Sequence, residues 1–243
     1  VRSCQLLFFY LLLLFSEKTE AQNFYLPAEL EKKASLGFFD PPSVQALNNY
    51  DLKYHRLQWY VDPTVNYIQG AVTSYLVPST SLSQIEFDLS PVLTVDSVKY
   101  HNVKLTAFQQ SGNLLLIDFS SPLLQGQLDS VTVFYRGAPS PTGMGSFKQS
   151  THNGTPIIWT LSEPYGAKDW WPCKQNLNDK IDSVDIIVTT PNAYRVASNG
   201  LLLSETVSGL DKIYHWKTRY PIAAYLIAIA VTNYSVYYDY VIN

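Results

Sequence analysis

The sequence predicts an all-β protein, an antiparallel multi-stranded sandwich, and three observations support this fold class. Aromatic residues make up 14% of the 243 residues, and aromatic side chains favour strands. Apolar and polar residues alternate with a period of two from residue 50 onward, as they do in half-buried strands. Such segments recur about every ten residues between Gly, Pro, Ser and Asn, which is typical of an antiparallel sandwich or barrel.

The overall composition excludes several classes of protein. Hydrophobic residues make up 47% of the chain and charged residues 15%, so the chain can bury a large core and is not disordered as a whole. The formal net charge of −3 provides no attraction for a phosphate backbone, so we expect no nucleic-acid partner.

The first 21 residues have the pattern of a signal peptide. Arg2 precedes an apolar run over residues 6–15, and the polar stretch that follows ends in Ala21. A helix of this run rises only about 15 Å, roughly half the thickness of a bilayer core, so we expect no stable membrane anchor. The sequence therefore predicts an exported protein, secreted, periplasmic or at the cell surface. Removal of Cys4 with the signal peptide would leave Cys173 as the single thiol, without an intrachain disulfide.

Residues 22–49 are predicted to form an N-terminal arm. Residues 28–34 are rich in helix-forming side chains, and the pair Pro41-Pro42 breaks that pattern. We therefore expect a short helical arm in front of the β domain, which we place at residues 50–240.

The first strands follow directly from the alternation. From residue 50 onward, His55, Leu57 and Trp59 share one face of a strand, and polar side chains occupy the other face. A turn at residues 62–64 leads into a second strand over residues 67–76. Three apolar residues then alternate with Glu86 and Asp88, so we expect both carboxylates to lie in water.

The remaining strands are expected between turn residues. They fall at residues 93–105, 114–119, 131–135, 157–161, 184–189, 194–198, 201–204 and 212–217. The turn-rich residues 137–145 suit a crossover between sheets. The apolar residues 222–231 are too few for a membrane helix and suit a strand buried on both faces. Aromatic alternation continues to residue 243 without a polar tail, so we expect a larger parent protein.

The sequence contains none of the common catalytic or metal-binding motifs. H-E-x-x-H, G-x-S-x-G, the P-loop and G-x-G-x-x-G are all missing. The four histidines are far apart in sequence and are expected at polar edges or on the surface: His55, His101, His152 and His215. Cys173 has no neighbouring histidine to activate its thiol. We therefore predict no catalytic residue and no metal ligand in this chain.

Residues 159–174 form the most unusual segment. A predicted strand ends in a loop that carries Glu163, three aromatic side chains, two prolines and Cys173. So much aromatic area rarely stays in water. The loop could be a corner folded onto its own sheet, an aromatic platform for sugars, or one wall of a cleft shared with another domain. Composition alone favours the corner.

Residues 162–173, with the sequence Ser-Glu-Pro-Tyr-Gly-Ala-Lys-Asp-Trp-Trp-Pro-Cys, resemble a segment of the aminopeptidase N family of zinc metallopeptidases. Residues 50–62, 135–137 and 220–231 match other segments of that family in the same order, and the resemblance extends from residue 50 to residue 234. Where family members commonly have Asp and Pro after the Cys, this chain has Gln175 and Leu177. The resemblance implies a saddle-like, mainly antiparallel N-terminal β domain that packs against a thermolysin-like zinc domain.

The resemblance also implies roles for the residues of this loop. Glu163 matches the polar side chain, Gln or Glu, that the family's β domain extends into the active site, where it would bind the α-ammonium group of a peptide. Two unit charges about 4 Å apart attract by about 4 kcal/mol at an effective dielectric constant near 20. Pro164 and Tyr165 would stiffen the loop and line the pocket for the first side chain. The other interpretation of Glu163 is a surface carboxylate at a strand end.

The remaining conspicuous residues of the loop are expected to pack. Cys173 is interpreted as a small buried apolar residue and not as a nucleophile. Trp170 and Trp171 are assigned to packing between the sheet and the neighbouring domain that this chain lacks.

The sequence thus predicts the N-terminal domain of an exported zinc aminopeptidase that removes N-terminal residues from peptides. Zinc would be held by an H-E-x-x-H helix of the full-length parent, and this chain alone would bind no metal and be inactive. Its partners would be peptide substrates, bound by way of the missing catalytic domain. One alternative is a non-enzymatic secreted β-sandwich module that binds carbohydrate or peptide on Trp170, Trp171 and Tyr165. Another is a family member that has lost its metal site.

Overall fold

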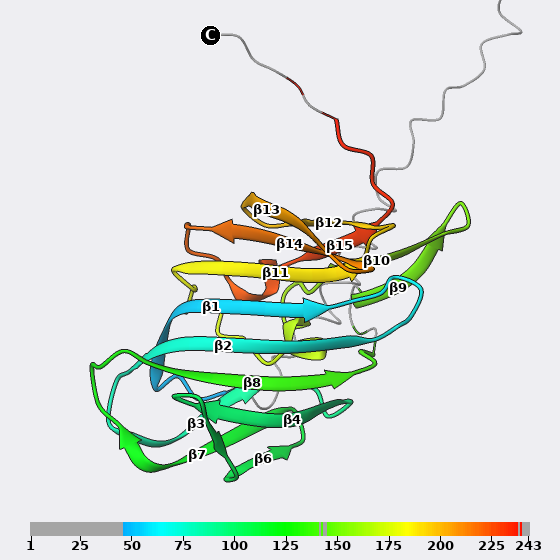
Figure 1. Ribbon diagram of the computed structural model, residues 1–243. Helices are drawn as coiled ribbons and strands as arrows, with labels where there is room; N and C mark the ends of the chain where they lie inside the picture. The colour runs from blue at the N-terminus through cyan, green and yellow to red at the C-terminus, as the bar shows by residue number, and fades with distance from the viewer. Residues whose placement is uncertain (1–45, 141, 143–144, 238, 240–243) are drawn as a thin grey trace, which may run out of the picture. The chain divides into compact units, whose positions relative to one another are not determined.

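The computed structural model describes residues 46–140, 142, 145–237 and 239, all of which belong to one compact unit. The predicted signal peptide and residues 22–45 of the predicted arm lie outside these residues. The described part contains fifteen strands and two short 3₁₀ turns, which confirms the all-β prediction (Figure 1). This part contains no helix that is long and apolar enough to span a membrane.

The strands form three sheets (Figure 1). The largest has eight strands in the spatial order β13 (Leu201–Ser208), β14 (Asp211–Thr218), β11 (Ser183–Pro191), β1 (Tyr50–Tyr60), β2 (Ile68–Pro78), β8 (Asp129–Gly137), β4 (Leu93–Tyr100) and β5 (Val103–Leu105). The second has four, in the order β12 (Arg195–Ser198), β15 (Ile229–Thr232), β10 (Thr155–Leu161) and β9 (Ser146–His152). The third has three, in the order β3 (Leu82–Asp88), β7 (Leu114–Leu123) and β6 (Phe108–Ser111). The 3₁₀ turns are η1 (Ala167–Asp169) and η2 (Ala224–Leu226).

The strands β1 and β11 are parallel neighbours, whereas the other strand pairs in the described residues are antiparallel. Parallel neighbours need a long connection. Here the connection contains all strands from β2 to β10 and the aromatic loop after β10. The far end of that loop is therefore attached where β11 enters the middle of the largest sheet.

The alternation predicted for β1 is confirmed, and it places large rings inside. Leu57 and Trp59 are buried on the inner face, while Arg56 on the outer face is exposed. Gly70 of β2 lies between Trp59 and Tyr135 in the strand register. A Cβ atom at Gly70 would lie 2.6 Å from Trp59 Cδ1 and 2.9 Å from Tyr135 Cε1. The absence of a side chain at this position thus leaves room for both rings.

Two strand predictions are wrong in their bounds. Residues 222–231 do not form one strand, because Ile222 makes an isolated bridge with Ile181, η2 follows, and β15 begins only at Ile229. A short apolar run fits a buried strand and a buried irregular segment equally well. Residues 93–105 form two strands, since His101 and Asn102 adopt φ values of 48° and 66° and close a two-residue hairpin turn.

Two strands were not predicted from the alternation. The strands β6 and β9 have the mostly polar sequences Phe-Gln-Gln-Ser and Ser-Phe-Lys-Gln-Ser-Thr-His, and each lies at an edge of its sheet. Backbone pairing with β7 and β10 holds them in place. An edge strand is covered on fewer sides, so its sequence carries a weaker apolar signal.

Candidate functional site

The loop between β10 and β11 is the candidate functional site, and its two adjacent tryptophans are its deepest part. Trp170 and Trp171 are fully buried. The ring of Trp170 lies 4.7 Å from that of Trp59, centroid to centroid, and 6.2 Å from that of Phe147. The ring of Trp171 lies 5.5 Å from the ring of His55 in an edge-to-face arrangement. These rings fill the space beneath β1.

The burial of Trp170 and Trp171 bears on two of the three interpretations of the loop. The part that holds these tryptophans is a corner folded onto its own sheet. The interpretation of the loop as one wall of a cleft shared with another domain stays a prediction. The assignment of these two side chains to an interface with a neighbouring domain is wrong, because rings inside this domain already cover them completely. The platform for sugars that included them is wrong for the same reason.

Hydrogen bonds fix the corner at Trp170. The indole Nε1 of Trp170 donates to Ser162 Oγ at 2.9 Å, and the hydroxyl of Tyr135 donates to the carbonyl of Trp170 at 2.8 Å. Both bonds are buried, where an unmade bond would cost about 1–3 kcal/mol. The position of the corner is thus set by β8 on one side and by the end of β10 on the other.

Asp88 anchors the loop to β3. The backbone amide of Asp88 donates to the carbonyl of Cys173 at 2.7 Å, and the amide of Cys173 donates back to the carbonyl of Asp88 at 3.0 Å. The carboxylate of Asp88 accepts a hydrogen bond from the backbone amide of Gln175 at 2.9 Å. Burial raises the pKa of Asp88, although the amides of Gln175 and Ala46 partly oppose the shift. The prediction that this carboxylate lies in water is wrong. Its position in the strand alternation is solvent-facing, but the loop covers it.

The interpretation of Cys173 as a packed side chain is confirmed. The thiol is fully buried, and burial together with the nearby Asp88 carboxylate raises its pKa well above the usual range. A thiol in that state has a negligible thiolate fraction at neutral pH and is therefore not a nucleophile.

Lys174 is a buried cation that no pattern in the sequence indicated. Its ammonium donates to the carbonyl of Tyr50 at 2.5 Å and to Asn48 Oδ1 at 2.9 Å, and it forms an ion pair with Asp179. It also lies 4.4 Å from the centre of the Tyr50 ring. These partners come from the start of β1 and from the loop itself. Lys174 thus fixes the second half of the loop, where Gln175 and Leu177 depart from the family pattern.

Glu163 lies at the tip of a tight turn at the start of the loop. The amide of Gly166 donates to the carbonyl of Ser162 at 2.8 Å and closes the turn. Glu163 is exposed, and its carboxylate makes no hydrogen bond or ion pair within the part of the chain that the structure describes. Pro164 and Tyr165 beside it are half-buried. The turn thus presents a carboxylate to solvent that no neighbour in this domain uses.

The turn that carries Glu163 is held against β9. Ser146 Oγ donates to the buried carboxylate of Asp169 at 2.8 Å, and Thr142 donates to the same oxygen. A Cβ atom at Gly166 would lie 2.2 Å from Ser146 Oγ, so a side chain at this position would require Ser146 to move. Lys168 Nζ donates to the carbonyl of Tyr165 at 3.3 Å. Glu163 therefore projects from a well-supported turn.

The histidines lie apart from this loop, with one exception. His55 was expected at a polar edge, and this is wrong: it is fully buried, and burial lowers its pKa to about 4. His101 pairs with Asp129 at 2.7 Å, and His152 is exposed.

A polar cluster surrounds Asp185 on the outer face of the largest sheet. The carboxylate of Asp185 accepts hydrogen bonds from Tyr54, His215 and Lys217 at 2.6–2.7 Å. Partial burial raises the pKa of Asp185, but these three donors outweigh burial and leave the pKa below its usual value. Within residues 46–237, apart from the few left undescribed, no three His, Cys, Asp or Glu side chains gather as a metal site would require.

Comparisons with known proteins agree on one relationship. The family model described as the peptidase M1 N-terminal domain matches residues 48–226. The M1 zinc metallopeptidase from Deinococcus radiodurans superposes with a TM-score of 0.69 at 22% sequence identity, covering 77% of this chain and 43% of that chain. A mutant of this enzyme bound to a Tyr-Ser-Ala substrate gives the same TM-score, identity and coverage. A two-domain M1 zinc metallopeptidase mutant bound to L-arginine gives a TM-score of 0.70 at 22% identity over 77% of this chain and 43% of that chain.

The similarity to these solved structures is limited in sequence identity and in length. At this identity the solved structures show the fold alone. This chain spans less than half the length of those structures. A search of curated protein sequences finds no match.

Proposed function

This chain belongs to the M1 peptidase family, whose N-terminal domain it matches over residues 48–226, and on that premise we propose that it is the N-terminal part of an exported zinc aminopeptidase. The parent enzyme removes N-terminal residues from peptides. Support comes from the match, which spans most of the chain, and from solved structures of the same fold whose names describe zinc metallopeptidases. Export rests on the signal-peptide pattern of residues 1–21.

The single observation that carries the proposal is the exposed carboxylate of Glu163, which has no partner among the residues that the structure describes. An aminopeptidase has to hold the free α-ammonium group of its substrate at a fixed distance from the bond that it cleaves. A carboxylate on a well-supported turn supplies that contact and disfavours substrates with a blocked N-terminus. The half-buried Pro164 and Tyr165 would line the space for the first side chain.

The residues of this chain do not fit a catalytic zinc ion. The sequence has no H-E-x-x-H, and the described residues contain no cluster of three metal-binding side chains. In the proposal, zinc belongs to a segment of the parent outside these 243 residues. The part of this chain is to bind and orient the substrate through Glu163.

The alternative of a carbohydrate or peptide platform is not favoured. That proposal depended on Trp170 and Trp171 together with Tyr165, and the two tryptophans are fully buried. Tyr165 alone does not form an aromatic platform.

Substitution of Glu163 in the full-length parent tests the proposed role. Glu163→Ala removes a charge-assisted contact worth about 1.5–3 kcal/mol, so we expect kcat/KM for aminoacyl anilides to fall by about 10- to 100-fold, mainly through KM. Glu163→Gln keeps an acceptor oxygen and should lose less. Steady-state kinetics on a panel of aminoacyl anilides provides the measurement.

Asp182→Asn is the matched control, because Asp182 is an exposed carboxylate near the end of the same loop. Its one ion pair within the described part of the chain is a 3.5 Å contact with Lys53. It should leave kcat/KM unchanged. If both Glu163 variants keep full activity, Glu163 does not bind the substrate amine. The same conclusion follows if their loss of activity is accompanied by a lower melting temperature, because the loss then reflects unfolding.

A further inference from the structure

The strand β13 forms an exposed edge of the largest sheet. It is the first strand in the spatial order of that sheet, so its outer backbone groups have no partner strand in the described part (Figure 1). Every residue of β13 is exposed. Leu201 is 74% exposed, Leu203 53% and Val207 64%, and Leu210 in the following turn is 88% exposed. This is an apolar strand with a free edge.

Edge strands usually carry features that prevent pairing with other chains, and β13 has only one of them, a bulge in its register between Leu202 and Ser204. Proteins protect edges with lysine, proline or inward-pointing charges. The sequence of β13, Leu-Leu-Leu-Ser-Glu-Thr-Val-Ser, has neither lysine nor proline. Its only charge, Glu205, is already paired with Arg195 at 3.1 Å and Lys212 at 2.8 Å. Apart from this bulge, no side chain of the strand therefore repels an added strand.

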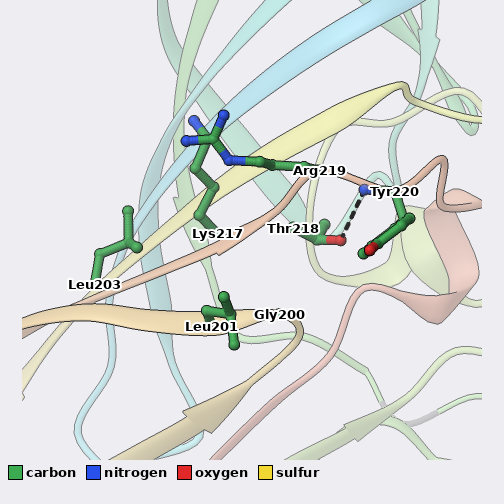
Figure 2. A pocket seen from close by; sticks show the side chains of 7 residues that line it. All are labelled: Gly200, Leu201, Leu203, Lys217, Thr218, Arg219 and Tyr220. Atoms are coloured by element: carbon green, nitrogen blue, oxygen red, sulfur yellow. Dashed lines mark hydrogen bonds between the residues drawn. The ribbon is translucent and has the colours of Figure 1, made fainter.

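A pocket of about 460 Å³ lies at the beginning of β13. It is lined by Gly200, Leu201, Leu203, Lys217, Thr218, Arg219 and Tyr220 (Figure 2). The strand contributes the leucines, the end of β14 contributes Lys217 and Thr218, and the segment after it contributes Arg219 and Tyr220. The pocket therefore combines apolar walls with two cationic side chains.

The charge of this pocket is not balanced. Lys217 forms an ion pair with Asp185 at 2.6 Å, whereas Arg219, which is exposed, makes no ion pair with any described residue. An acidic group of a partner would complement Arg219, and an apolar group would fill the space beside Leu201 and Leu203.

We propose that the free edge of β13 binds an extended segment of another polypeptide as an additional strand. The segment has an apolar side chain and an acidic side chain at alternate positions on one face. Backbone hydrogen bonds to β13 provide binding, as in other cases of strand addition, and the pocket provides selectivity. The apolar side chain enters the pocket, and the acidic side chain, two residues away on the same face, pairs with Arg219.

A second copy of this chain is a poorer occupant of the same edge. Pairing of β13 with β13 would bring only Glu205 as a charge, and Glu205 is already paired within its own molecule. Arg219 would then remain without an acidic partner. Charge complementarity thus favours a separate acidic and apolar peptide.

A peptide array tests the proposal on the full-length polypeptide that contains these residues. Each peptide has eight residues. Two positions on the same face, two residues apart, are varied through all pairs of amino acids across the array, and every other position is threonine. We expect the strongest binding for pairs of one aliphatic and one acidic residue. Arg219→Glu should weaken the best peptide about tenfold and shift the preference to basic residues, and Leu203→Lys should abolish binding. Anisotropy titration with the best labelled peptide measures the change.

Lys104→Glu is the control, because Lys104 is an exposed cation of β5, the strand at the opposite edge of the same sheet. It should leave binding of the best peptide unchanged. The proposal is overturned if no pair is preferred, if acidic and basic peptides bind equally, or if Arg219→Glu has no effect. It is also overturned if sedimentation shows a dimer that Leu203→Lys dissociates, since β13 would then pair with a second copy.

Discussion

At the scale of single residues, His55 has the least ordinary environment. It is fully buried, its ring contacts Trp171 edge to face, and neither ring nitrogen has a hydrogen-bond partner among the described residues. A charged imidazole in such a place would lose its hydration, and the backbone of Thr73 would compensate only a small part of that loss. His55 is therefore neutral in the folded protein at neutral pH.

The buried His55 makes stability depend on pH. Its pKa is about 4 in the folded state against 6.5 for an unperturbed histidine. The unfolded chain binds the proton more tightly, so the contribution of His55 is fully present above pH 6.5 and is lost as the pH falls through 4. The total loss is about 3 kcal/mol. Urea unfolding of the chain between pH 7 and pH 4 should show this decline.

The matched variant is His55→Leu, which fills a similar volume and does not titrate. Its free energy of unfolding should decline less between pH 6.5 and pH 4 than that of the unmodified chain. His152→Gln, at an exposed position, should leave the pH dependence as it was. Identical slopes for the unmodified chain and His55→Leu would contradict the assignment.

At the scale of elements, the loop after β10 depends on the fit between three strands and its tryptophans. Gly70 of β2 stands between Trp59 of β1 and Tyr135 of β8, and the Trp59 ring contacts Trp170. Tyr135 in turn donates a hydrogen bond to the backbone of Trp170. A change at Gly70 is therefore transmitted to the loop that carries Glu163.

Substitution of Gly70 should destabilise the domain. The methyl group of Gly70→Ala would lie 2.6 Å from Trp59 Cδ1, so the ring has to move. Overpacking of this kind costs about 1–3 kcal/mol. Chemical denaturation of the Gly70→Ala variant measures the cost.

The double variant Gly70→Ala with Trp59→Phe identifies the cause. A smaller ring relieves the clash, so the cost of the double variant should be less than the sum of the two single costs. Additive costs would show that the Trp59 ring does not set the requirement for glycine.

At the scale of the whole molecule, the described unit has a continuous apolar core, but its residues include no group that could cleave a peptide bond in the way a zinc peptidase does. Its three sheets bury a continuous set of apolar side chains, and the loop after β10 is part of that core. The turn with Glu163 is the part of this loop to which we assign a chemical role, and its carboxylate faces solvent. Substrate binding by a carboxylate does not by itself cleave a peptide bond.

The 243-residue chain on its own should hydrolyse no aminoacyl anilide, with or without added zinc, because it contains no H-E-x-x-H. Equilibrium dialysis against zinc should show no tight, stoichiometric binding.

The gene sequence that follows residue 243 should encode H-E-x-x-H within about the next hundred residues. Stoichiometric zinc binding, or cleavage by the chain alone, would contradict this picture, and a stop codon directly after residue 243 would remove the enzyme from the proposal.

The sequence by itself determined the fold class, the alternation of β1, and the place of the turn with Glu163. These properties depend on local order along the chain, since a strand shows its two faces through a period of two. The resemblance in residues 162–173 also identified the family, which the match over residues 48–226 confirms.

The tertiary structure alone decided which side chains the loop covers. Asp88 looked solvent-facing and His55 looked like an edge residue, yet both are buried, and Trp170 and Trp171 pack inside the domain. Each of these outcomes depends on a partner distant in sequence: Cys173 for Asp88, Trp171 for His55 and Trp59 for Trp170. The periodicity of a strand predicts the face on which a side chain lies. Whether that face is covered by another segment depends on the packing of the whole chain.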